Sequence, residues 1–128
     1  MQLLRIASKT QSSISKNAFN RQSVKPVASG FSIDLTAQAE DDLLDGYWFY
    51  EAQQVDLGNY FLDSLYGDIH SLTIFAGIHA KAYPGIYRTL SARFPFAIYY
   101  VVNSNAATVL AVLDTRQNPK TIQSRLTG

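Results

Sequence analysis

The side chains that could do chemistry in this sequence are two histidines, a run of acids and a group of arginines. His70 and His79 are nine residues apart, and no standard metal motif has that spacing. There is no cysteine, and glycine-rich phosphate loops, His-Glu-x-x-His and Gly-x-Ser-x-Gly are also missing. We therefore expect no metal and no cofactor. We expect His70 to pack, partly buried, beside a helix stripe and His79 to be exposed in a loop.

Four acids lie close together in the sequence, at Glu40, Asp41, Asp42 and Asp45. Two carboxylates that face a cleft, one of them with a raised pKa, could serve a glycosidase as acid and base. These four fall in the first turns of a predicted helix, where the helix dipole stabilises the ionised form. We therefore interpret the cluster as a solvated helix start.

Aromatic and basic side chains gather toward the C-terminus. The aromatic residues that could stack on nucleic-acid bases are Phe94, Phe96, Tyr99 and Tyr100. Such sites interleave aromatic with many basic residues, whereas the segment 31–128 has six basic and ten acidic residues, so core packing is the better interpretation. The basic residues of its C-terminal third are Arg88, Arg93, Arg116, Lys120 and Arg125. A partly basic face and a set of exposed element ends both explain this distribution.

Hydrophobic periodicity predicts one strand and two helices in the first half of the domain. Residues 31–35 alternate apolar and polar side chains, as a half-buried strand does. Apolar residues then recur at helical spacing over 37–54 and again over 57–73, with Thr36 and Asp56 as the capping residues. The short link between the helices predicts an antiparallel hairpin.

Three strands and a short helix are expected to follow. Residues 74–85 have no clear period and are predicted to form a loop, and strands are predicted at 86–91, 94–102 and 108–113. Pro119 suits the first turn of a last helix that ends near residue 126. The fold class is therefore α+β, in the order β-α-α-β-β-β-α, with a helical hairpin on a small antiparallel-rich sheet. The residues expected to be buried in the sheet are Ile98, Tyr100, Val109, Ala111 and Leu113.

The charge of +1 hides a division of the chain. Residues 1–30 carry five basic and no acidic residues, and they have few large apolar side chains. We expect 1–29 to be a mostly disordered basic arm and 30–128 to be the folded domain. The arm resembles a transit peptide or a nucleic-acid-binding tail, but an arm without function, from a start codon assigned too early, is our preferred interpretation. The longest apolar run has nine residues, so no membrane span is expected.

Several short motifs, none of them a signature alone, occur in one order along the predicted domain. They are Leu35-Thr36, Ala39-Glu40-Asp-Asp-Leu43, Tyr47-Trp-Phe-Tyr50, Leu57-Gly58-x-x-Phe61-Leu62, Tyr87-Arg88, Arg93-Phe-Pro-Phe-Ala-Ile-Tyr-Tyr100, Val109-Leu-Ala-Val-Leu113, Thr115-Arg-Gln-Asn-Pro119 and Arg125-Leu126. In this order and spacing they resemble toxins of the ParE/RelE superfamily, the toxin half of type II toxin–antitoxin modules, also known as plasmid stabilisation proteins.

The resemblance implies one of two activities. RelE-like toxins cut mRNA on the ribosome, and the family does this with alternating Lys and Arg on its second strand, an Arg early in the third and later basic groups. Characterised ParE-like toxins instead bind and poison DNA gyrase. Here Arg88 fills the first basic position, but Leu90 takes the second and Ala97 replaces the Arg of the third strand. Arg116 matches the later Arg. The resemblance therefore favours the ParE-like branch, a growth-inhibiting binding toxin with no confident catalytic residue.

Two alternatives remain: a RelE-like endoribonuclease that relies on Arg88 and Arg116, and an inactive toxin kept as the antitoxin's co-repressor. The resemblance implies a cytoplasmic protein with an antitoxin partner, DNA gyrase or the ribosome as target, and indirect DNA association through the antitoxin. The residues expected to bind the target are Arg88, Arg93, Arg116, Lys120 and Arg125. The residues expected to bind the antitoxin are Tyr47, Tyr50, Phe61 and Leu65.

Overall fold

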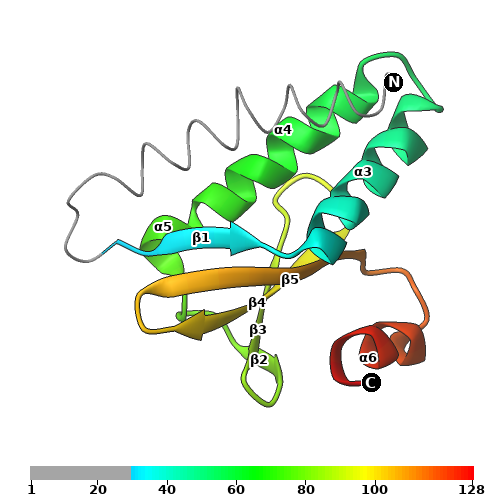
Figure 1. Ribbon diagram of the computed structural model, residues 1–128. Helices are drawn as coiled ribbons and strands as arrows, with labels where there is room; N and C mark the ends of the chain where they lie inside the picture. Colours follow the sequence, from blue (N-terminus) through cyan, green and yellow to red (C-terminus); the bar gives the residue numbers. More distant parts are fainter. Residues whose placement is uncertain (1–29) are drawn as a thin grey trace.

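A five-stranded mixed sheet forms the centre of the domain in the computed structural model, which describes residues 30–128 (Figure 1). The strands are β1 (Ser32–Leu35), β2 (Lys81–Tyr83), β3 (Ile86–Leu90), β4 (Phe96–Asn103) and β5 (Ala106–Asp114). Their order across the sheet is β1-β5-β4-β3-β2; β1 pairs parallel with β5, and the other pairs are antiparallel. The predicted α+β class is confirmed. The expected arm, 1–29, lies outside the described residues.

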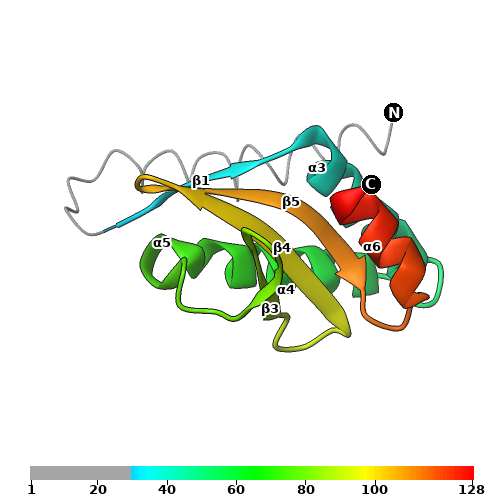
Figure 2. The ribbon, with the colours of Figure 1, turned by 90° about the horizontal axis from the view of Figure 1, so that it is seen from below.

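Two long helices pack as a hairpin on one face of this sheet. They are α3 (Ala37–Glu51) and α4 (Leu57–His70), and the one-turn helix α5 (Leu72–Phe75) follows α4. The last helix, α6 (Pro119–Thr127), lies beside the C-terminal end of β5, away from α5, as Figure 2 shows. The predicted hairpin and the predicted C-terminal helix are thus confirmed.

Strand β4 is apolar from Phe96 to Val102, and both of its faces are covered. Phe96, Ile98 and Tyr100 belong to the main core between the sheet and the helical hairpin. Ala97 and Tyr99 point the other way, into a second cluster that α6 covers. The five side chains predicted to be buried, Ile98, Tyr100, Val109, Ala111 and Leu113, are all at most 6% exposed. The prediction of these five buried residues is confirmed, and β4 is covered on both faces.

The link between α3 and α4 is capped differently from the prediction. Both helices end earlier than predicted, at Glu51 and His70 instead of 54 and 73. Asp56 precedes α4 with a left-handed φ of 71°, but its side chain makes no capping hydrogen bond. The Glu51 carboxylate caps α4 instead: it accepts hydrogen bonds from the backbone N–H groups of Asp56 at 3.0 Å and Gly58 at 2.9 Å. A carboxylate at the end of one helix thus caps the next.

The predicted loop over 74–85 is only partly right, because α5 extends into it as far as Phe75 and β2 occupies Lys81–Tyr83. Neither element is long enough to show a period: α5 is one turn with Leu72 buried, and β2 has three residues. Strand β2 turns back onto β3 through Gly85, whose φ of 76° suits glycine. The sheet therefore has four strands after the hairpin rather than three.

Two glycines set the distance between α3 and α4. A Cβ atom at Gly46 would lie 2.4 Å from the Phe61 ring, and one at Gly58 would lie 2.7 Å from the backbone oxygen of Tyr47. The ring could shift, but the backbone oxygen belongs to the facing helix and cannot move without separating the hairpin. Gly67, on α4, has no such neighbour.

The substitution Gly58→Ala should lower the free energy of unfolding by about 1–3 kcal/mol, the usual cost of an overpacked core. Gly67→Ala is the matched control on the same helix, and it should raise the free energy of unfolding by about 0.5–1 kcal/mol through helix propensity. Urea denaturation followed by circular dichroism measures both. Equal effects of the two substitutions would contradict the close approach at Gly58.

Candidate functional site

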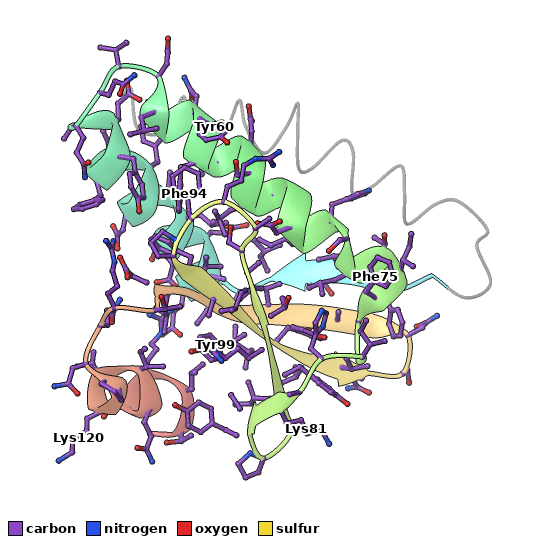
Figure 3. The ribbon with its side chains drawn as sticks, turned by 180° about the vertical axis from the view of Figure 1, so that it is seen from behind. Tyr60, Phe75, Lys81, Phe94, Tyr99 and Lys120 are labelled. Atoms are coloured by element: carbon purple, nitrogen blue, oxygen red, sulfur yellow. The ribbon has the colours of Figure 1, made fainter. Side chains whose placement is uncertain are left out.

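The side of the sheet opposite the helical hairpin is only partly covered. In the β3–β4 ladder Arg88 lies opposite Tyr99, and Leu90 lies opposite Ala97. Because paired residues point to the same side, all four face away from the hairpin; we name these four residues the open sheet face. Figure 3 shows Tyr99 on this side, between α6 and the β2–β3 hairpin. The two strand positions singled out in the sequence, 90 and 97, are therefore direct neighbours.

The open sheet face is mostly hydrocarbon. Leu90 is 58% exposed, whereas Ala97 is completely buried and Tyr99 is 4% exposed. Arg88 is exposed, and within residues 30–128 it has no hydrogen bond or ion pair with another side chain. A site that cleaves RNA must stabilise a pentacovalent phosphorane with several cations. The open sheet face offers one cation, Arg88.

The other basic residues predicted to bind a target come from separate elements. Arg93 is exposed in the β3–β4 loop, and Lys120 is exposed on α6 (Figure 3). Arg116 pairs with Asp114 through its Nη2 atom at 2.6 Å, and this contact lowers the pKa of the Asp114 carboxyl. Arg125 is paired as well, with Asp42. The structure therefore leaves Arg88, Arg93 and Lys120 as the unpaired members of the predicted set within residues 30–128.

The prediction that the four acids at the start of α3 are solvated is wrong for Asp42. Its side chain is 11% exposed and receives both Arg125 guanidinium nitrogens, at 3.1 and 2.7 Å. It also accepts the backbone N–H of Val112 at 2.9 Å. Burial raises the pKa of Asp42, and the contacts with Arg125 and Val112 oppose that rise. One carboxylate thus joins α3, β5 and α6.

A cleft of about 270 Å³ opens beside this junction, between α3 and the C-terminal end of β5. Its lining residues are Asp42, Asp45, Gly46, Phe49, Phe96, Val112, Leu113, Asp114 and Gln117. We name it the α3–β5 cleft. The sequence alone does not reveal this cleft, because its walls come from α3 and β5, which are about 70 residues apart in the chain.

His79 lies in the loop between α5 and β2, as predicted, but it is half-buried rather than exposed. Its Nδ1 is hydrogen-bonded to the Tyr100 hydroxyl, which also accepts the backbone N–H of Gly77 at 3.0 Å. The Tyr100 ring is fully buried and stacks on Tyr87, and the Lys81 ammonium lies over the Tyr87 ring, 5.4 Å from its centre. This network ties the segment after α5 to the central strand. His70 is partly buried on α4, as predicted.

The four side chains predicted to contact an antitoxin lie inside the domain. Tyr47, Tyr50, Phe61 and Leu65 are at most 9% exposed and pack between the hairpin and the sheet. Helical periodicity identified the apolar stripe correctly, but that stripe faces the sheet. The exposed large apolar residues near the hairpin tip are Trp48, Phe49, Val55 and Tyr60.

The described residues show no grouping of three or more His, Cys, Asp or Glu side chains that could hold a metal ion. None of the helices in 30–128 has the length and apolar character needed to cross a membrane. Surface features of the described domain include the open sheet face, the α3–β5 cleft and the exposed aromatic residues at the hairpin tip.

Comparison with known proteins supports the fold. No family model matches the chain, and no curated protein matches its sequence. A solved structure of the chromosomal ParDE TA system from P. aeruginosa contains a similar chain, with a TM-score of 0.60 and 19% sequence identity. The match covers 66% of this chain and 95% of that chain. The two chains share one fold. The ParE/RelE-like architecture predicted from the sequence is thus confirmed.

The contact between Asp42 and Arg125 should matter for stability. Arg125→Met leaves a largely buried carboxylate without its cation, so the free energy of unfolding should fall by about 2–4 kcal/mol. The double variant Asp42→Asn/Arg125→Met should recover much of this loss, because no buried charge remains. Since the pKa of Asp42 should rise further without Arg125, the deficit of the single variant should shrink as the pH falls. A deficit that does not depend on pH would contradict this assignment.

His79 should make the domain sensitive to acid. Burial lowers the pKa of His79 below its ordinary value near 6.5. The folded domain therefore favours neutral imidazole, and this stabilisation is complete above about pH 6.5 and is lost as the pH falls through the lower, folded pKa. His79→Gln, which does not titrate, should lose less stability than the wild type between about pH 7.5 and pH 5. NMR titration of the imidazole gives the pKa directly, and a value above 6.5 would contradict the burial argument.

Proposed function

We propose that this domain is the toxin of a type II toxin–antitoxin module and that it acts in the ParE-like manner, by binding and inhibiting a cellular target. Two observations support the proposal. The fold is shared with a chain of a ParDE system, which supports the toxin–antitoxin assignment. On the open sheet face, exposed Leu90 lies opposite buried Ala97, where the RelE-like relatives would place cations. This second observation carries the choice of a binding toxin over a nuclease.

The chemistry explains why two missing cations matter. Cleavage of RNA by its 2′-hydroxyl needs a base for the hydroxyl proton, cations for the phosphorane and an acid for the leaving oxygen. Losing one preorganised group of this kind costs on the order of 10² to 10³ in rate. A hydrocarbon and a methyl group replace two of them here, while Arg116 is held by Asp114. A surface with Arg88 beside Leu90 is better suited to contact a protein.

The proposed partners are a cognate antitoxin and DNA gyrase. An antitoxin segment that folds on binding would cover apolar surface of the domain, and Trp48, Phe49 and Tyr60 offer such surface on the helical hairpin. The acidic charge of segment 31–128 favours a segment that carries Lys or Arg. DNA association would be indirect, through the antitoxin. Gyrase is proposed because characterised ParE-like toxins bind it, and the site of action would be the cytoplasm.

Expression with and without the neighbouring short reading frame tests the toxin–antitoxin assignment. The protein alone should arrest growth, and co-expression of the neighbour should restore it through a complex with nanomolar affinity. Pull-down and isothermal titration calorimetry measure the complex. A neighbour that neither binds nor relieves the arrest would contradict the module.

Primer extension on mRNA from translating ribosomes separates the two branches. The wild-type protein should produce no codon-specific cuts, because its sheet face cannot stabilise the phosphorane. Clear cuts that disappear in Arg88→Ala, with the fold of that variant verified by circular dichroism, would assign the domain to the RelE-like endoribonuclease branch instead.

A further inference from the structure

The α3–β5 cleft combines an apolar floor with an acidic rim. Phe96 and Val112 form the floor, and Phe49 of α3 forms a wall that is 54% exposed. An exposed phenyl ring beside a concave apolar surface can cover the hydrocarbon part of a ligand. The floor therefore suits a side chain of a few methylene groups.

The charges around the cleft do not cancel. The three carboxylates that line it belong to Asp42, Asp45 and Asp114. Arg125 neutralises the first and Arg116 the third. Asp45 is exposed on α3 and has no ion-pair partner among the described residues, which leaves one unmatched negative charge at the rim. Asp45 also contributes to the raised pKa of Asp42, as a local excess of negative charge should.

We propose that the α3–β5 cleft binds an arginine or lysine side chain of a partner protein, with the methylene stem on the apolar floor and the cationic head at Asp45. Both residue types bury their stems along apolar surface and keep the charged end in water. Arginine fits better, because its planar guanidinium is weakly hydrated and matches a carboxylate in a bidentate manner. The inference deepens the proposed function, since it specifies the chemistry of an anchor on the antitoxin segment.

A metal ion is a poorer occupant of the same space. Two of the three carboxylates already receive hydrogen bonds from arginines, and the floor provides no oxygen ligand. Hard cations need six or more oxygen ligands, or several ordered waters. The combination of an apolar floor with one unpaired carboxylate favours an organic cation.

Binding of n-butylguanidinium to the ¹⁵N-labelled full chain, followed by NMR, tests this inference. The control ligand is n-butylurea, which has nearly the same shape but no charge. The cation should shift the backbone amides of Gly46, Val112 and Asp114 with a dissociation constant on the order of millimolar, about fivefold tighter than the urea. Equal binding of the two ligands, or shifts confined to other parts of the domain, would overturn the proposal.

Matched substitutions on α3 locate the contact. Asp45→Asn should abolish the preference for the cation, whereas Asp41→Asn, which removes an exposed acid of the same helix outside the cleft, should retain it. Phe49→Ala should weaken both ligands, because both use the apolar wall. Equal effects of the two Asp substitutions would indicate general attraction to an acidic helix and would overturn the proposed site.

This experiment is independent of toxicity. If the cleft binds the cation but the protein does not arrest growth, the proposed function fails while the cleft assignment stands. If growth arrest and its relief by the neighbouring protein are observed but the cleft does not bind the cation, only the inference on the anchor fails.

Discussion

The carboxylate of Asp42 holds together the elements on which the surface features depend. It receives the guanidinium of Arg125 and the backbone N–H of Val112, so α3, α6 and β5 meet at one side chain. Breaking such a contact is costly because it leaves a desolvated charge without a partner. Two consequences follow. Helix α6 is fixed over only part of the second sheet face, and α3 is fixed at the distance from β5 that opens the α3–β5 cleft.

Helix α6 covers only part of the sheet face opposite the hairpin, and this leaves apolar surface exposed. Its Ile122 packs on Tyr99, Ala111 and Leu113, but the β3 end of the same face stays open and carries Leu90. Burying a surface of this composition against a partner is favourable. The same surface has too few cations to stabilise a transition state with several negative charges. The fold shared with a ParDE chain and the chemistry of this face both fit the proposed function, a toxin that acts by binding.

The sequence predicted those parts of the fold that depend on local patterns. The apolar run of β4, the period of α3 and α4 and the Pro119 start of α6 all have physical signals within a few residues. The errors concern short elements, helix ends and contacts between side chains that a local pattern does not mark. Glu51 capping α4, Asp42 pairing with Arg125 and His79 bonding to Tyr100 need neighbours that no local pattern shows. The residues predicted to bind the antitoxin lie in the core for a similar reason. Periodicity identifies an apolar stripe on a helix, but it does not show whether the sheet or a partner covers that stripe.

DNA gyrase supercoiling in the presence of the purified full chain measures whether the domain inhibits its proposed target by binding. The expected result is a loss of supercoiled product that depends on the concentration of the protein and is reversed by the cognate antitoxin. The loss should persist without ribosomes or RNA in the reaction, because no RNA chemistry is involved. Undiminished supercoiling at saturating concentrations of the protein would contradict the proposed inhibition.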